Sequence, residues 1–160
     1  MVQVLVAYSS RSGNTEKLAR AVARGVESEG AAALVKRASE TTKEDLAAAD
    51  AIILGSPVYF GTATAEMKDL IDRSVGVRRK LRDKVGAAFV TAGHHTGGKE
   101  TTILSMLYAF LIHEMVVVGD PIDSGGHYGA ACLGAPDAEA EKAGALLGAR
   151  VARVARKLKG

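Results

Sequence analysis

Ser9-Ser10-Arg11-Ser12-Gly13-Asn14-Thr15 follows directly on the apolar run Val2 to Tyr8, and this junction decides the fold. A continuous apolar run is typical of a strand that is covered on both faces. A helical pattern of apolar residues begins at Asn14. The stretch therefore predicts a strand, a short polar turn and a helix in immediate succession.

The polar turn has the composition of an anion site. Ser10, Ser12 and Thr15 bring hydroxyl groups, and Gly13 lets the backbone come close to a ligand. The helix start adds free N–H groups and the positive end of its dipole. These hydroxyl and N–H donors suit a terminal phosphate monoester. The ATP-type and dinucleotide-type glycine motifs do not occur in the chain. The alternative is an ordinary strand-to-helix turn with capping residues.

Composition favours one globular domain covering residues 1–160. The chain has 48% hydrophobic and 24% charged residues, and its net charge of +3 is spread along the sequence. This modest charge is poor evidence for a nucleic acid partner, and no apolar run is long enough to span a membrane. The single Cys132 and the lack of a signal-peptide pattern favour a cytoplasmic location.

Strand and helix patterns alternate along the whole chain. The predicted strands are Val2–Tyr8, Ala33–Lys36, Ala51–Leu54, Val85–Val90 and Met115–Val118. The predicted helices begin at Asn14, Thr42, the segment before Met67, Thr101 and Asp137, and 120–136 is expected to be a long Gly-rich connection. This alternation predicts an α/β protein with a doubly wound, five-stranded parallel sheet between two helical layers.

Three loops should meet at the carboxyl rim of that sheet, where doubly wound sheets bind their ligands. They are the first loop (9–15), the second loop (56–62) and the third loop (91–98). The second loop places Tyr59 and Phe60 beside Gly61, so that exposed aromatic rings could stack on a planar ligand. The alternative for Phe60 is that it fills the core.

The third loop offers backbone N–H groups and two imidazoles, His94 and His95. Adjacent histidines point in different directions and no other ligand shows partner spacing, so a metal is not predicted. The more reasonable interpretation is that this loop closes over a heteroaromatic ring of a ligand.

These motifs carry a family resemblance. Residues 8–15 resemble the FMN-phosphate loop of flavodoxins. Residues 55–61 with Met67, the stretch 91–119 and residues 125–130 resemble segments of the WrbA-type NAD(P)H:quinone oxidoreductases. The resemblance spans nearly the whole chain and implies a flavodoxin-like sheet of strand order 2-1-3-4-5 with FMN as cofactor.

The resemblance also implies a set of site residues. FMN would be held by Ser10, Arg11, Ser12, Gly13, Asn14, Thr15, Pro57, Val58, Tyr59, Phe60, Gly61, Thr91, Ala92, Gly93, His94, His95, Gly97 and Gly98. NADH or NADPH would be the reductant, and a quinone-like small molecule or a redox protein the acceptor. A homo-oligomer is also implied.

His113 matches a family histidine on the substrate side of the flavin, which implies a catalytic role. A histidine in the last turn of a helix is equally typical of a cap or a packed core residue. Both interpretations stay open at this point.

The chain departs from the family pattern in a few places. Tyr59 stands where these enzymes usually carry a basic residue, His94 and His95 replace small residues, and the segments around 77–80 and 120–127 are shorter. Three functions remain: an FMN-dependent reductase of quinones or flavins, a flavodoxin-type single-electron carrier, and a non-catalytic protein with the same fold.

Overall fold

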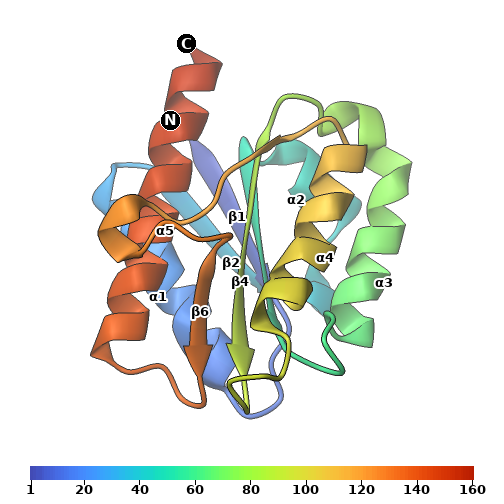
Figure 1. The fold of residues 1–160 in the computed structure, drawn as a ribbon. Helices are drawn as coiled ribbons and strands as arrows, with labels where there is room; N and C mark the ends of the chain where they lie inside the picture. Colours follow the sequence, from blue (N-terminus) through green and yellow to red (C-terminus); the bar gives the residue numbers. More distant parts are fainter.

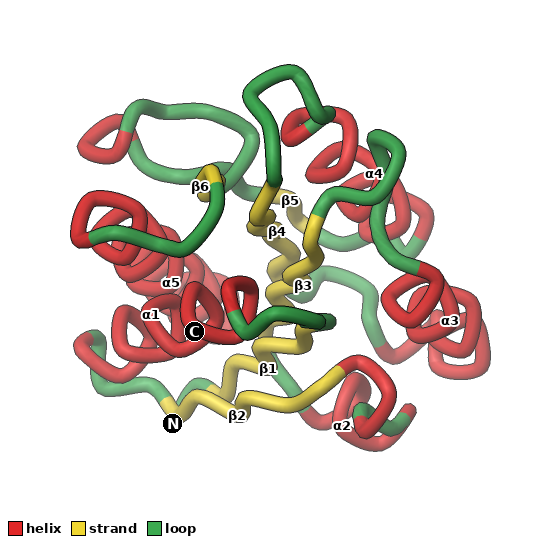
Figure 2. Tube along the Cα trace, turned by 90° about the horizontal axis from the view of Figure 1, so that it is seen from below, coloured by secondary structure: helices red, strands yellow, loops and turns green.

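Buried strands form the centre of the computed structural model, which describes residues 1–160. A parallel sheet runs in the order β2-β1-β3-β4-β5, with helices on both faces (Figures 1 and 2). The strands are β1 (Gln3–Tyr8), β2 (Ala32–Arg37), β3 (Ala51–Pro57), β4 (Val85–Ala92), β5 (Val116–Val117) and β6 (Ala130–Leu133). The helices are α1 (Asn14–Ser28), α2 (Lys43–Ala48), α3 (Ala65–Arg73), α4 (Lys99–Ile112) and α5 (Ala138–Lys159), with 3₁₀ turns at Ala38–Glu40, Ser74–Lys80 and Ile122–Ser124. The predicted strand order is confirmed.

Each face of the sheet carries its own apolar core. The β1 side chains alternate between them, because successive residues of a strand point to opposite faces. Val4 and Val6 pack under α1 and α5, while Leu5 and Ala7 pack under α2, α3 and α4. The two faces together explain why β1, β3 and β4 read as continuous apolar runs, whereas the edge strand β2 is only half-buried.

Helices α1 and α5 lie unusually close together because glycines stand at their contact. An added Cβ at Gly25 would collide with the Ala145 carbonyl, and one at Gly148 would collide with the Val22 carbonyl. This close contact fixes α1, and with it the first loop, against the sheet.

The far edge of the sheet differs from the prediction of one strand over Met115–Val118. β5 spans two residues and pairs with Val85–Gly86, while β6 pairs with Phe89–Ala92. Two separate segments therefore share the fifth position, and residues 118–129 leave the sheet between them. β6 lies inside the segment that the sequence predicts as a connection, since its residues, Ala130-Ala131-Cys132-Leu133, are mostly too small to give a strand signal.

No helix of the chain is both long enough and apolar enough to cross a membrane.

Candidate functional site

The three predicted loops do meet at one rim of the sheet. β1, β3 and β4 are parallel neighbours, so the loops that follow them leave the sheet at the same end. Figure 2 looks onto this end. The Ser9 N–H donates to the Gly55 carbonyl at 2.9 Å, and the Val58 N–H donates to the Thr91 carbonyl at 2.8 Å. Backbone hydrogen bonds thus join each loop to its neighbour.

The first loop leaves a helix N-terminus without a side-chain cap. Gly13 precedes α1 with φ of 90°, and Gly98 precedes α4 with φ of 101°, and neither helix is capped by a side chain. By contrast, α2, α3 and α5 are capped by Thr42, Thr64 and Asp137. Free N–H groups therefore point out of the two helices that follow the first and third loops.

The hydroxyl groups of the first loop have different roles. Ser12 is exposed, and Ser10 Oγ accepts from the Gly13 N–H at 3.1 Å. Thr15 is buried, and its Oγ1 lies 2.8 Å from Thr91 Oγ1. The Thr15 hydroxyl therefore has Thr91 as a hydrogen-bond partner within the protein. Thr15 offers its backbone N–H and supports the loop from below.

Arg11 in the first loop and Arg37 beside it differ in their partners, since only Arg37 is paired with a carboxylate. Arg37 donates to the Ser10 carbonyl at 3.1 Å and forms an ion pair with Glu16 at 3.4 Å. The hydrogen bond from Arg20 lowers the pKa of Glu16, so this carboxylate is ionised at neutral pH. Arg11 has no carboxylate within ion-pair distance and lies over the Tyr59 ring. The first loop therefore carries an uncompensated positive charge.

The second loop is a tight hairpin. Tyr59 and Thr62 exchange two backbone hydrogen bonds of 3.1 Å, and between them Phe60 and Gly61 adopt φ of 51° and 75°. The Phe60 side chain is fully exposed at the tip of the turn. The alternative that Phe60 fills the core is wrong. A positive φ is unusual for a bulky residue and is typical of functional turns.

Hydrogen bonds of four side-chain hydroxyls, which the sequence did not predict, fix the second loop. Ser9 Oγ lies 2.7 Å from Thr64 Oγ1, and the Thr64 N–H donates to Ser56 Oγ at 3.1 Å. Thr101 Oγ1 donates to the Gly61 carbonyl at 2.7 Å. Ser9 and Ser56 lie inside the predicted first and second loops, and Thr64 stands three residues before Met67 as a helix cap. The contacts among these hydroxyls were recognisable only once the loops were placed together.

The third loop exposes both histidines at the rim. His94 Nδ1 lies 3.0 Å from Thr96 Oγ1, and the His94 and His95 rings meet edge to face at 6.3 Å. Behind them, Gly98 approaches Gly61 so closely that an added Cβ on Gly98 would lie 2.7 Å from the Gly61 Cα. The second and third loops therefore touch through glycine backbone.

His113 lies elsewhere. It ends α4, and the neighbouring Val116 N–H donates to the Lys84 carbonyl at the start of β4, opposite to the rim. His113 is buried, and its Nε2 lies 2.7 Å from Ser74 Oγ. Within one chain the structure does not bring His113 to the three loops, and its contacts are those of the cap or packed residue.

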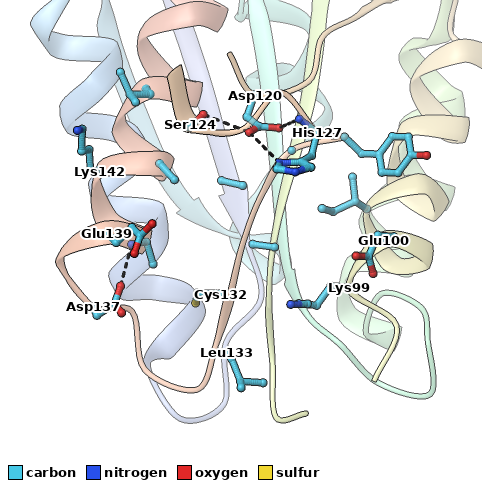
Figure 3. A pocket seen from close by; sticks show the side chains of 18 of the residues that line it. Lys99, Glu100, Asp120, Ser124, His127, Cys132, Leu133, Asp137, Glu139 and Lys142 are labelled. Atoms are coloured by element: carbon cyan, nitrogen blue, oxygen red, sulfur yellow. Dashed lines mark hydrogen bonds and ion pairs between the residues drawn. The ribbon is translucent and has the colours of Figure 1, made fainter. Parts of the chain in front are cut away.

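A cavity of about 670 Å³ lies beside the three loops and not over them. Figure 3 shows it at the open edge of β6, between α4 and α5. Its lining holds five carboxylates and two lysines, among them Asp120, whose buried side chain accepts from the His127 N–H at 2.8 Å. Cys132 faces this region, and burial, more than the nearby Asp137, raises the pKa of its thiol to about 11. An acidic cavity does not suit a phosphate, so the first loop remains the anion site.

Comparison with known proteins shows the family of the chain. Residues 35–127 match the family described as NADPH-dependent FMN reductase. A protein of Archaeoglobus fulgidus named NAD(P)H dehydrogenase (quinone) is 38% identical over 99% of this chain and 100% of its own. A protein of the same name from Sinorhizobium fredii is 36% identical over 99% of both chains.

The chain belongs to this NADPH-dependent FMN reductase family. A solved structure described as a flavodoxin, WrbA-like protein from Agrobacterium tumefaciens superposes with a TM-score of 0.84 and 29% identity, over 98% of this chain and 99% of its own. A flavodoxin from the domain Archaea, at 23% identity and a TM-score of 0.81, shares the fold over 97% of this chain and 99% of its own. The alignment with the Archaeoglobus protein spans 190 positions against 160 residues here, so gaps open in this chain.

The three loops at the rim of the sheet have residues that fit FMN, the flavin in the family's name. FMN ends in a phosphate dianion, and the first loop supplies an uncapped helix start, free hydroxyls and the unpaired Arg11. The space beside Gly13 is open, with no atom within 4 Å of an added Cβ. Aromatic side chains and glycine backbone for a planar ring stand next to it on the second and third loops.

Proposed function

We propose that this protein is an FMN-dependent NAD(P)H:quinone oxidoreductase. The observation that carries the proposal is the convergence of an uncapped, positively charged phosphate loop and two ring-binding loops at one rim. The full-length similarity to proteins named NAD(P)H dehydrogenase (quinone) supports the choice of donor and acceptor.

The first loop would hold the phosphate. Ser12 and Ser10 donate hydroxyls, Arg11 donates from its guanidinium, and the N–H groups of the first turn of α1 point at the anion. Because no adenylate-binding motif accompanies this loop, we expect FMN and not FAD to be the bound flavin.

The second and third loops would hold the flavin ring between residues 57–61 and 91–98. Bound FMN supplies the electron-transfer chemistry. The chain itself fixes the ring by the hairpin at Tyr59–Thr62, by the Thr101–Gly61 hydrogen bond and by backbone N–H groups of the third loop. Such preorganised donors stabilise negative charge that develops near them. Phe60, His94 and His95 lie exposed where an acceptor would arrive.

We place the protein in the cytoplasm, acting on a small-molecule quinone in preference to a redox protein. The only cysteine is buried, which suits a reducing compartment. Within this account His113 has no catalytic role in its own chain.

Reconstitution tests the proposal. The purified chain is mixed with FMN, FAD and riboflavin, and the bound flavin is identified after gel filtration. The FMN-loaded protein is then assayed for NADH and NADPH oxidation with a soluble quinone. We expect tight FMN binding and quinone-dependent oxidation. Preferential FAD binding, or no quinone dependence with either nucleotide, would contradict the proposal.

A further inference from the structure

A single side-chain contact joins the exposed parts of the first and second loops. The Arg11 guanidinium carbon lies 5.2 Å from the centroid of the Tyr59 ring, within the range of a cation–π contact. Arg11 is exposed and Tyr59 is half-buried. The hairpin bonds to Thr62 fix the backbone of Tyr59.

The contact with Tyr59 leaves the hydrogen-bonding capacity of Arg11 free. A guanidinium that interacts with an aromatic ring through its charge keeps its five N–H donors for other partners. Arg11 makes no hydrogen bond or ion pair in the structure, in contrast to Arg37, which is held by Ser10 and Glu16. The contact with Tyr59 therefore restricts the long Arg11 side chain without consuming a single donor.

We propose that Tyr59 positions Arg11 as a phosphate donor, and that the pair sets the preference for a phosphorylated flavin over an unphosphorylated one. The proposal rests on the proposed function, because it assumes that FMN occupies the three loops. It assigns to a residue of the second loop an effect on the anion bound by the first. Ordering Arg11 before binding removes part of the entropy that phosphate binding would otherwise cost.

The competing interpretation is that Tyr59 contacts only the flavin ring. A ring contact is the same for FMN and riboflavin, which differ by the phosphate alone. The two interpretations therefore predict different patterns of loss when the Tyr59 ring is removed.

Dissociation constants for FMN and riboflavin, from quenching of flavin fluorescence, decide between them. The proteins are the wild type, Tyr59→Leu, Tyr59→Phe, Arg11→Ala and the double variant Tyr59→Leu/Arg11→Ala. We expect Tyr59→Leu to weaken FMN binding by about two- to fivefold more than it weakens riboflavin binding, because that difference is the size of an exposed cation–π contact. Tyr59→Phe keeps the ring face and should bind FMN like the wild type.

Arg11→Ala should weaken FMN binding by about tenfold or more, since it removes charge-assisted hydrogen bonds. In that background Tyr59→Leu should weaken FMN binding no more than it weakens riboflavin binding. Arg79→Ala and Tyr108→Leu are matched controls, because both residues are exposed and lie outside the three loops. Far-UV circular dichroism verifies that each variant is folded.

Equal losses of FMN and riboflavin affinity in Tyr59→Leu would overturn the proposal, as would additive effects in the double variant. In both cases the wild type would still bind FMN, and the proposed function would stand. A wild-type protein that binds neither flavin would contradict the proposed function and this proposal together.

Discussion

Thr15 Oγ1 and Thr91 Oγ1 lie 2.8 Å apart beneath the first and third loops, and both residues are buried. The hydrogen bond joins the first turn of α1 to the carboxyl end of β4. The loops that would hold the two ends of the flavin are thus fixed relative to each other by one buried contact.

Thr91→Val should therefore destabilise the protein and weaken its FMN site. The substitution leaves the Thr15 hydroxyl buried without its partner, which costs about 1–3 kcal/mol of unfolding free energy. Urea unfolding measures this loss, and the double variant Thr15→Val/Thr91→Val should recover part of it. Thr62→Val, at an exposed threonine, is the control and should stay within about 0.5 kcal/mol of the wild type. A Thr91→Val protein as stable as the control would show that the contact contributes nothing.

Ser12→Asp tests the phosphate site. The new carboxylate would stand in the exposed first loop and repel a phosphate dianion, so FMN affinity should fall by about tenfold or more while the fold remains intact. Ser28→Asp adds the same charge at the opposite end of α1 and should leave FMN affinity unchanged. Equal FMN affinity in Ser12→Asp and the wild type would mean that the phosphate binds elsewhere.

Phe60→Gly tests the role of the hairpin tip. Phe60 is fully exposed and has φ of 51°, so the variant loses no buried surface and gains a residue that accepts this conformation. Its unfolding free energy should lie within about 1 kcal/mol of the wild type, whereas removing a buried phenylalanine costs about 3–5 kcal/mol. Reactivity with quinone should fall if Phe60 contacts the acceptor. Unfolding at a much lower urea concentration would place Phe60 in the core after all.

His113 makes the stability of the protein depend on pH. Burial, and then the charge of Arg78, lower the pKa of His113 from 6.5, and its Nδ1 has no hydrogen-bond partner. The unfolded state therefore binds the proton more readily than the folded state. The folded state is therefore destabilised relative to the unfolded state as the pH falls below 6.5, whereas above pH 6.5 His113 causes no such loss of stability.

Urea unfolding between pH 7 and 5 measures this effect in the wild type and in His113→Gln. The loss of stability on acidification should be smaller in His113→Gln, while His95→Gln, at an exposed histidine, should behave like the wild type. Identical pH dependence of stability in all three proteins would show that His113 does not cause the loss of stability on acidification. The rate of flavin reduction should be the same in His113→Gln and the wild type.

The sequence predicts the parts of this protein that depend on local pattern. Apolar runs located β1, β3 and β4, and the polar residues that follow them located the three loops. It could not predict β6, because alanine and cysteine give no strand signal and the pairing with Phe89–Ala92 is set by tertiary contact. Nor could it show that the Thr15 hydroxyl is occupied by Thr91, 76 residues away, or that Phe60 points outward from a strained turn. The position of His113 could not be predicted either. The family resemblance implied a place near the flavin, whereas α4 carries His113 to the end of the sheet opposite to the three loops.

Anaerobic stopped-flow mixing of the FMN-loaded protein with NADH and, separately, NADPH tests the central claim most directly. The visible flavin absorbance is followed after mixing, and a quinone is added in a second mixing step. We predict rapid and complete bleaching with at least one nucleotide, followed by rapid return of the absorbance with the quinone. Absence of bleaching with both nucleotides would contradict the account and would favour a carrier that exchanges electrons with protein partners.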